Sequence, residues 1–581
     1  MNYSQLIQSL VNDTNGSLKL FGPELALCAT IVVMLLLRVF RGLGKIDAFW
    51  VALIGSVVGL WFSAPWKQLD SIASIQRTEL FTGMLVYDSF SIYFRSILLF
   101  FAVLFVLFTK LSGIPDREDA PDFYTLVLGA TVGMCLMATA NHLIIIFLGV
   151  EMASVPSYAL AGMLKGRPRS SEAALKYSVY GAGAAGVMLY GISLLAGALG
   201  TCHIPTAAQR LADLISEGHL ADQGLVLGLG GLMIGVGLAF KLSAFPFHFW
   251  CPDVFEGAAA EVNAFLSVAS KAAALALLIR VAVGFTTLPL QQAGARPLPG
   301  GVAVNVNAAE LKSQALIAAD HASLSKLAFH LAAFEAPAAE GRDPLAPVRS
   351  FIVLLIALFA AVTCTFGNLA AYGQTNIKRL MAYSTIAHAG YIMMPVAAAV
   401  ALSGTSTVAA EGAYAAVPFY VGLYLFMNLG AFAIVAFLRN ATGSEEIADF
   451  GGLVRTSPGV VVCLGVILFS LVGLPPLAGF AAKYVAFASV VRAMQAPGFR
   501  SVMLTLLIIG GLNTALSLFY YLRVIKTMAI DPEPIDRPTK GFSLVSLPGA
   551  YIVLVTLPVL ILGIFWDQFY TWLWSGATNL M

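Results

Sequence analysis

The stretch FKLSAFPFHFWCPDVFEGA, residues 240–258, ends a long apolar run with a lysine and then a proline. Lys241 lies inside a run long enough to cross a bilayer, and Pro246 follows it five residues later. Proline removes a backbone N–H donor and clashes with the preceding turn, so the helix should break and leave carbonyl groups unpaired. Irregular backbone at membrane depth is tolerated only where protein or a water-filled cavity covers it. The stretch therefore predicts a membrane helix that is interrupted beside a buried charge.

A second stretch with the same features, LVGLPPLAGFAAKY, covers residues 471–484, where Pro475 and Pro476 precede Lys483. Interrupted helices in corresponding positions of two halves are typical of transporters built from inverted repeats, with an ion site near the midplane. The alternative is a pair of simple proline kinks beside lysines whose side chains reach the membrane surface. That alternative is awkward because both lysines lie well inside long apolar segments.

The composition is that of a polytopic membrane protein. Hydrophobic residues make up 59% of the 581 residues and charged residues only 11%. The net charge of +2 gives no indication of nucleic-acid binding. The six cysteines are scattered singly, without the spacing that zinc or iron–sulfur ligation needs, so we expect them to be packing residues. No basic segment precedes a short apolar core at the N-terminus, so no cleaved signal peptide is expected.

Apolar runs of the about 20 residues needed to span a bilayer recur along the chain. They predict an all-α integral membrane protein with about fourteen transmembrane helices, at residues 22–40, 47–64, 88–109, 122–140, 142–164, 173–199, 224–248, 260–286, 348–371, 379–403, 412–438, 458–492, 501–526 and 547–574. Lys and Arg concentrate in the loops that follow the odd-numbered helices, which the positive-inside rule assigns to the cytoplasm. Both termini are therefore expected on the non-cytoplasmic side of a bacterial inner membrane.

The loop at residues 287–347 is the one clear shift in composition. It begins with a Pro- and Gly-rich stretch that is typical of a linker. From Asn307 to Glu335, large apolar residues recur at helix-like spacings among charged ones, which predicts an amphipathic helix on the outer membrane surface or on a neighbouring subunit. A loosely ordered insertion without a function is the alternative. In either case we expect the segment to lie outside the membrane and to be dispensable for transport.

Five charged residues lie inside or at the rims of the predicted helices: Glu151, Lys176, Lys241, Lys271 and Lys483. A charge near the bilayer centre costs roughly 2.5 to 3.5 kcal/mol even on lenient insertion scales, so such residues usually face a protein interior or a water path. Burial disfavours the ammonium form of a lysine, and a nearby carboxylate favours it. Moving such a partner would load or release a proton. Several such residues in one chain predict a route for ions.

Glu151 lies well inside its predicted helix and is the candidate partner of Lys241. His248, seven residues after Lys241, and His388 could relay protons because an unperturbed imidazole titrates close to neutrality. Each histidine could equally be a hydrogen-bonded packing residue.

Lys176 has a simpler alternative explanation. It follows Glu172 by four residues, so the two would form an ordinary i,i+4 ion pair on a helix surface.

Residues 240–278 resemble the signature of subunit N of proton-pumping NADH–quinone oxidoreductase, respiratory complex I. Four further stretches share this resemblance: FLGVEMASVPSYAL at 147–160, SEAALKYSVYGAGAAGVMLYG at 171–191, TNIKRLMAYSTIAHAGY at 375–391 and GLPPLAGFAAKY at 473–484. The resemblance covers nearly the whole chain. The resemblance implies two inverted five-helix repeats, each with one broken helix.

The resemblance also implies a division of the chain. It consists of N-terminal helices at 1–121, a first antiporter-like repeat at 122–286, the extramembrane insertion at 287–347, a second antiporter-like repeat at 348–526 and a C-terminal helix at 527–581.

The resemblance assigns proton transfer to Glu151, Lys176, Lys241, Lys271 and Lys483, with His248 after the first break; His388 is added as a possible relay. The chain departs from the family at EGAAAEV, residues 256–262, where a proline-containing stretch is usual and where Glu261 is added. This departure puts the local loop geometry in doubt. The long outer loop is also unusual.

The function implied is outward proton transport by a subunit of a proton-translocating NADH:quinone oxidoreductase. The chain has no Gly-rich dinucleotide motif and no cysteine cluster, so NADH, FMN, iron–sulfur clusters and quinone are expected to bind in other subunits. The expected partners are the other membrane subunits of complex I, including neighbouring antiporter-like subunits, and the lipid bilayer.

Two alternatives remain open. One is an Mrp-type cation/proton antiporter subunit, which would use similar buried lysines. The other is a membrane scaffold without transport, which would gain nothing from the insertion cost of four interior lysines.

Overall fold

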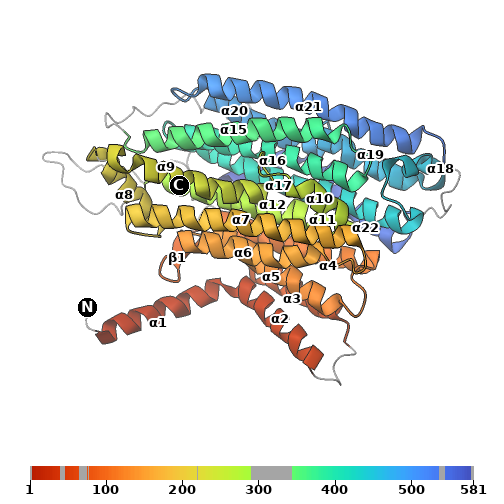
Figure 1. Ribbon diagram of the computed structural model, residues 1–581, viewed down its shortest axis with the longest axis horizontal. Coiled ribbons are helices and arrows are strands. Elements are labelled where there is room, and N and C mark those ends of the chain that lie inside the picture. The colour runs from red at the N-terminus through yellow and green to blue at the C-terminus, as the bar shows by residue number, and fades with distance from the viewer. Residues whose placement is uncertain are drawn as a thin grey trace.

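The computed structural model describes residues 3–39, 46–63, 75, 77–218, 220–288, 343–534 and 543–577. Long helices lie side by side and run nearly parallel to the longest axis of the molecule (Figure 1). The elements of the first half are α1 Tyr3–Leu20, α2 Gly22–Val39, α3 Ala48–Ser63, β1 Thr78–Leu80, β2 Leu85–Tyr87, α4 Ser89–Ser112, α5 Ala120–Thr139, α6 Leu143–Ala161, α7 Pro168–Leu199, α8 Ile204–Ser216, α9 Leu220–Leu242, α10 Trp250–Gly257, α11 Ala260–Phe265, the π-helical turn η3 Leu266–Ser270 and α12 Lys271–Thr286.

The second half begins after the insertion. Its elements are α15 Ala346–Ala371, α16 Ile377–Leu402, α17 Thr407–Thr442, the 3-10 turn η4 Ile447–Phe450, α18 Leu453–Thr456, α19 Pro458–Val472, α20 Ala478–Ala493, α21 Arg500–Ala529, α22 Leu547–Ile564 and α23 Trp566–Ala577. The predicted insertion helix at Asn307–Glu335 lies outside the described residues.

The all-α membrane architecture is confirmed. Within the described residues, twelve helices are long and apolar enough to cross a membrane, and α3 and α19 are shorter apolar helices. The count of fourteen spans and the division into two repeats stay predictions. The sequence did not predict the small antiparallel β1–β2 hairpin, nor α1 and α8, which lie outside the runs of about 20 apolar residues that a span requires.

The predicted C-terminal helix at 547–574 is wrong in one respect. It is divided at Phe565, whose backbone leaves the helical region at φ −104° and ψ 40°. The residues that follow, beginning Trp566–Asp567–Gln568, are more polar than the apolar run before them. α22 is therefore the apolar helix and α23 a separate, amphipathic one.

Both predicted breaks are present, so the segments expected at 224–248 and 458–492 are each interrupted beside their prolines. α9 ends at Leu242, where Ser243 takes a left-handed φ of 57°, and α10 begins at Trp250. α19 ends at Val472 with Gly473 at φ 93°, a region that favours glycine.

The two pieces at the second break are closely joined. The backbone N–H of Gly479 donates to Ser470 Oγ at 2.9 Å. A Cβ atom on Gly479 would lie 1.7 Å from the Ser470 carbonyl oxygen, so only glycine permits this contact. The start of α20 is therefore fixed against the end of α19.

Two buried ion pairs tie the helices together. Arg95 of α4 pairs with Glu24 of α2, and Arg280 of α12 pairs with Asp88, the N-cap of α4, through bonds of 2.5 and 2.6 Å. Both arginines are buried, so each charge lies in the interior beside its carboxylate partner.

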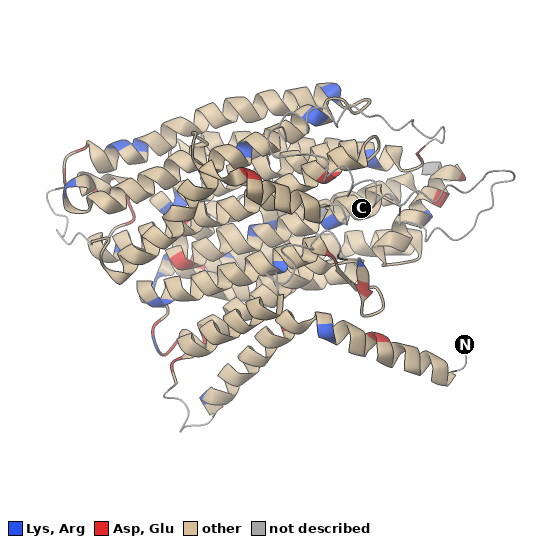
Figure 2. Ribbon diagram, turned by 180° about the vertical axis from the view of Figure 1, so that it is seen from behind, with Lys and Arg blue, Asp and Glu red and all other residues tan. Residues whose placement is uncertain are grey.

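The two ends of the bundle differ in structure. α8, the β1–β2 hairpin and the first turn of α1 lie at one end, called here the α8 end, and α18 lies at the other, the α18 end (Figure 1). Most charged residues gather toward the two ends, and a few basic ones lie midway along the helices (Figure 2). By the predicted topology the α18 end is cytoplasmic.

Candidate functional site

Lys241 lies in the last turn of α9, directly before the first break, and only 2% of it is exposed. Its Nζ donates a hydrogen bond to Ser154 Oγ of α6 at 2.9 Å. The ammonium group is therefore held inside the bundle. The alternative of a lysine that reaches the membrane surface is wrong at this position.

Glu151 lies on α6, three residues before Ser154, and is partly buried. Its charge acts on Lys241. Among the described residues the two groups form no direct ion pair, and the hydroxyl of Ser154 is the group in contact with the ammonium. The predicted pair is thus brought close, with a hydroxyl on the same helix face as the carboxylate.

Lys176 differs from the other lysines because its side chain is 33% exposed. Its Nζ lies 2.7 Å from a carboxylate oxygen of Glu172, so the i,i+4 ion pair is confirmed. It also lies 2.7 Å from Asp253 of α10. Lys176 therefore ties α7 to the short helix that follows the first break.

His248 lies in the first break, between α9 and α10. Its ring centroid is 4.3 Å from that of Phe366 and 5.3 Å from that of Phe245. In the described part of the chain, these aromatic contacts are its closest ring neighbours, and none of the lysines touches it. Its Nδ1 is buried without a hydrogen-bond partner among the described residues, so the relay role stays a prediction.

Lys271 is the first residue of α12 and follows the π-helical turn η3. It is 3% exposed, and its Nζ has no hydrogen-bond partner among the described residues. A buried polar group without a partner is costly, so the site calls for ordered water. Single π-helical turns are frequently found at functional sites.

His388 lies in the middle of α16 and is 2% exposed. Its Nδ1 is 2.9 Å from Tyr420 Oη of α17. The charges of Lys271 and Lys483 both act on this ring. His388 is therefore a hydrogen-bonded core residue that also lies within electrostatic reach of two of the predicted lysines.

Lys483 lies on α20 and is 4% exposed. Its Nζ donates to the carbonyl oxygen of Val472 at 2.9 Å, and this carbonyl is one that the second break leaves unpaired in α19. The ammonium also lies 4.4 Å from the centroid of the Tyr391 ring. The alternative of a lysine that reaches the membrane surface is therefore wrong for Lys483 as well.

A chain of buried polar side chains continues beyond Lys483. Asn368 Nδ2 donates to Tyr391 Oη at 2.9 Å and to Asn513 Oδ1 at 3.3 Å. Tyr520 Oη donates to Asn368 Oδ1 at 3.0 Å. These residues come from α15, α16 and α21, so the polar chain crosses the second half of the bundle.

Sequence reasoning missed these polar residues, together with Ser154. A usable signal was present, because Asn368 and Asn513 are amides within long apolar runs, where polar groups are expensive and usually functional. Ser154 gave no comparable signal, since serines are common in the same helices.

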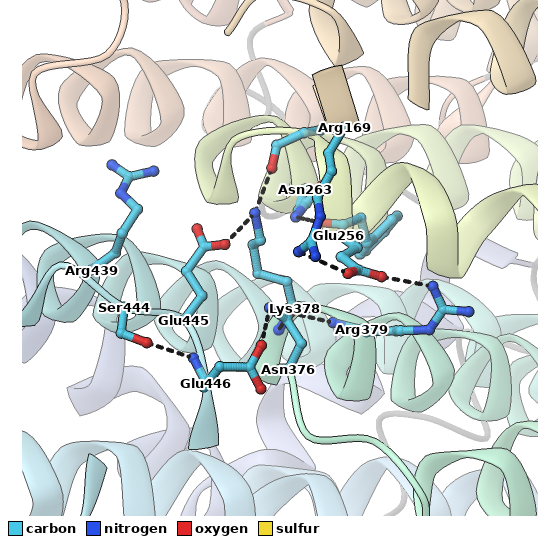
Figure 3. A network of polar contacts seen from close by, with 12 residues as sticks. Arg169, Glu256, Asn263, Asn376, Lys378, Arg379, Arg439, Ser444, Glu445 and Glu446 are labelled. Carbon is cyan, nitrogen blue, oxygen red and sulfur yellow. Dashed lines mark hydrogen bonds and ion pairs between the residues drawn. The ribbon is translucent and has the colours of Figure 1, made fainter. Parts of the chain in front are cut away.

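A second network of charges lies at the α18 end (Figure 3). Glu256 of α10 accepts from Arg379 of α16 at 2.8 Å and pairs with Arg169 of α7 at 3.2 Å. Arg379 also donates to Asp253 at 2.8 Å. This network joins α7, α10 and α16, the elements around the first break.

Glu261, the residue that departs from the expected pattern, is fully buried and accepts from Arg439 Nη2 of α17 at 3.1 Å. The departure therefore forms an ion pair between α11 and α17. Among the described residues no group of three or more His, Cys, Asp and Glu side chains is placed to hold a metal ion.

Comparison with known proteins agrees with this arrangement. Residues 140–291 and 340–509 match the family described as "NADH:quinone oxidoreductase/Mrp antiporter, TM". The chain is 34% identical over 574 residues to the NADH-quinone oxidoreductase subunit N of Anaeromyxobacter sp. (strain Fw109-5), covering 97% of each protein.

Two solved structures share the fold. A chain of respiratory complex I from Thermus thermophilus is 27% identical, with a TM-score of 0.64, covering 94% of this chain and 98% of that one. A chain of the Mrp complex from Dietzia sp. DQ12-45-1b has a TM-score of 0.71 at 17% identity, covering 97% and 98%, which shows the fold alone. From the broken helices, the buried lysines and these similarities together, the chain belongs to the NADH:quinone oxidoreductase/Mrp antiporter family of membrane subunits.

Proposed function

We propose that this chain is the subunit N of a proton-translocating NADH:quinone oxidoreductase and that its buried lysines carry the protons. The observation that carries the proposal is Lys271, a buried ammonium group without a hydrogen-bond partner among the described residues. A scaffold has no use for so costly a group. The subunit N relatives cover nearly the whole chain, which supports the choice within the family.

The proposed axis starts at Glu151 and runs through Lys241 and Lys271 to His388 and Lys483. Each lysine interacts with a group that can favour or disfavour its charge. The Glu151 carboxylate favours the charge on Lys241. The His388 ring interacts with the charges of both Lys271 and Lys483. Moving one partner changes which lysine holds a proton. A proton then passes from one lysine to the next through water and hydroxyl groups.

The redox chemistry belongs to other subunits in this proposal. NADH oxidation and quinone reduction, with FMN and iron–sulfur clusters, supply the free energy. This chain's residues bind, hold and release protons. Conformational change in neighbouring membrane subunits would reach the axis through the charges at the helix breaks.

The assembly would lie in a bacterial inner membrane with the α18 end in the cytoplasm, as the distribution of Lys and Arg in the loops predicts. Adjacent antiporter-like subunits would contact the lateral faces of the bundle. Both chain termini would lie on the non-cytoplasmic side.

An Mrp-type antiporter subunit is the second candidate, and the shared fold with the Mrp complex favours it. The two functions differ in their driving reaction. A complex I subunit moves protons when NADH is oxidised, and an Mrp-type subunit exchanges cations for protons without NADH.

The test is purification from the native membrane, followed by reconstitution into vesicles. We expect the chain in a large assembly that oxidises NADH and acidifies the vesicle lumen without added sodium. Recovery in an assembly that lacks NADH oxidation, with sodium-driven proton exchange, would contradict the proposal and favour the Mrp-type function.

A further inference from the structure

A polar pocket of about 370 Å³ opens beside the loops that precede α7 and follow α17. It is lined by the loop that precedes α7, the start of α16 and the residues that follow α17, including Arg167, Asn376, Arg439, Ser444, Glu445 and Glu446. Its volume is far above the about 10–15 Å³ that a single water molecule needs, and its lining offers many polar partners. Water therefore reaches Glu445 from outside.

Glu445 connects this pocket with the interior. Its side chain is 18% exposed, and its carboxylate lies 2.7 Å from the Nζ of Lys378, which is 2% exposed. The same Nζ donates to the Ala258 carbonyl oxygen, between α10 and α11, at 2.8 Å (Figure 3). Lys378 thus touches an accessible carboxylate on one side and the backbone beside the first break on the other.

A polar face leads from Ala258 inward to Lys271. Asn263, Ser267 and Lys271 follow one another at four-residue intervals along α11, η3 and α12, so they lie on neighbouring turns. Asn263 donates to the Phe255 carbonyl oxygen at 2.7 Å, but its Oδ1 is buried without a partner among the described residues.

The Nζ of Lys271 is likewise buried without a hydrogen-bond partner among the described residues. Two orphaned polar atoms on one helix face are best satisfied by water, because each would otherwise cost the desolvation of its group. The unpaired atoms of Asn263 and Lys271 therefore call for ordered water along this face, which Ser267 joins.

We propose that Lys378 and Glu445 form the proton-entry pair that loads Lys271 from the α18 end. Lys378 gives its proton to the water beside Asn263, and that water passes a proton on to Lys271 in its neutral amine form. Glu445 takes a proton from pocket water and returns it to Lys378, and the outside solution restores the proton to the pocket water. Lys378 and Glu445 regain their starting charges, and Lys271 has gained one proton. This inference rests on the proposed function.

The charged groups that face Lys378 balance one another. They are Glu445, Arg439 of α17 and Glu261 of α11. Glu261 and Arg439 form their own ion pair, so Glu445 is the carboxylate left to exchange protons with Lys378. Lys271 in turn lies close enough to Cys251 and His388 to interact electrostatically with both.

The experiment measures proton pumping by the intact complex in vesicles, with the pH varied only on the α18 side. In Lys378→Met and Glu445→Gln we expect pumping at least about tenfold slower at neutral pH, because a positioned proton carrier is lost. The remaining rate should fall as the pH on the α18 side rises. Glu445→Asp, which retains the carboxylate, should recover most of the rate.

The matched control is the exposed ion pair of Lys165 and Asp119 at the same end, with atoms 2.6 Å apart and the lysine side chain 76% exposed. Lys165→Met and Asp119→Asn should pump like the wild type at every pH. Asn263→Leu provides a second test that leaves the Lys378–Glu445 pair in place, and it should show the same pH-dependent loss by blocking the water path.

Wild-type pumping in Glu445→Gln or in Asn263→Leu would overturn the proposal. A loss that is equal at every pH and is not recovered by Glu445→Asp would also overturn it, since that pattern indicates a structural role. If Lys271→Ala stops pumping and Lys378→Met does not, only the entry route is wrong; if Lys271→Ala also pumps normally, the proposed function itself fails.

Discussion

The two broken helices place their lysines on opposite sides of the break. Lys241 comes just before the first break, at the end of α9, and Lys483 comes after the second, in α20. Lys241 is held by a side-chain hydroxyl, with the Glu151 carboxylate acting on it. Lys483 is held by the carbonyl of Val472 and the face of Tyr391.

This difference indicates two kinds of control. The charge on Lys241 is favoured by a carboxylate on another helix, α6. The ammonium of Lys483 is stabilised by a backbone carbonyl at the second break and by an aromatic ring on α16, with no carboxylate beside it among the described contacts. We infer that the first site is the switch and the second a station that passes protons onward. The following variants sharpen or break that comparison.

Lys241→Ala and Lys483→Ala should have the largest effects. Without a titratable group, a charge must pass an apolar site at a cost of roughly 2.5 to 3.5 kcal/mol, which corresponds to about a 100-fold loss in the rate of proton transfer. Pumping in vesicles measures this, with assembly checked by the yield of NADH-oxidising complex. Lys165→Met serves as the exposed control, and normal pumping by a fully assembled Lys241→Ala complex would remove that lysine from the axis.

Glu151→Gln should lower pumping by about tenfold, because it keeps the shape but removes the attraction for the Lys241 ammonium. Glu151→Asp retains the charge and should do less harm. Measuring Glu151→Gln and Lys483→Ala side by side in the same assay compares the two sites directly. Equal pumping by the wild type and the Gln variant would show that the first site is no switch.

Ser154→Ala should lower pumping by about fivefold, since one charge-assisted hydrogen bond is lost and a water can partly replace it. Ser157→Ala is the matched control on the same helix, because Ser157 is also buried and bonds only the Ala153 carbonyl oxygen among the described residues. If both serine variants pump equally, the hydroxyl at Ser154 does not position the lysine.

Tyr391→Leu should have the smallest effect, about threefold, through loss of the contact between the ammonium and the aromatic ring. Tyr391→Phe keeps the ring and should stay closer to the wild type. The reverse order, with the Phe variant the weaker of the two, would assign the role of Tyr391 to its hydrogen bond with Asn368.

Local chemistry explains what could be predicted from the sequence. The length of each apolar run locates the long helices, and a proline near a lysine locates both breaks. Both signals can be read from one continuous stretch of sequence. The polar helix α1, the short helix α8 and the division at Phe565 fall outside a rule that looks for about 20 apolar residues.

The partners of the lysines could not be predicted in the same way. Ser154 is 87 positions from Lys241, and the Val472 carbonyl is available to Lys483 because the start of α20 packs against the end of α19. Such contacts depend on how distant helices pack. Lys176 has one contact of each kind. The i,i+4 rule predicts its ion pair with Glu172, whereas its ion pair with Asp253 depends on how α7 and α10 pack.

The central claim is that the buried lysines carry protons while electron transfer takes place in other subunits. The most direct measurement is the number of protons moved per NADH oxidised by the intact complex with Lys271→Ala, in vesicles with a pH-sensitive dye. Because Lys271 lies between the two breaks and the proposal assigns electron transfer to other subunits, we expect NADH oxidation to continue, with an uncoupler present to relieve back-pressure. Fewer protons should be moved per NADH. An unchanged proton-to-NADH ratio in a fully assembled Lys271→Ala complex would contradict the account.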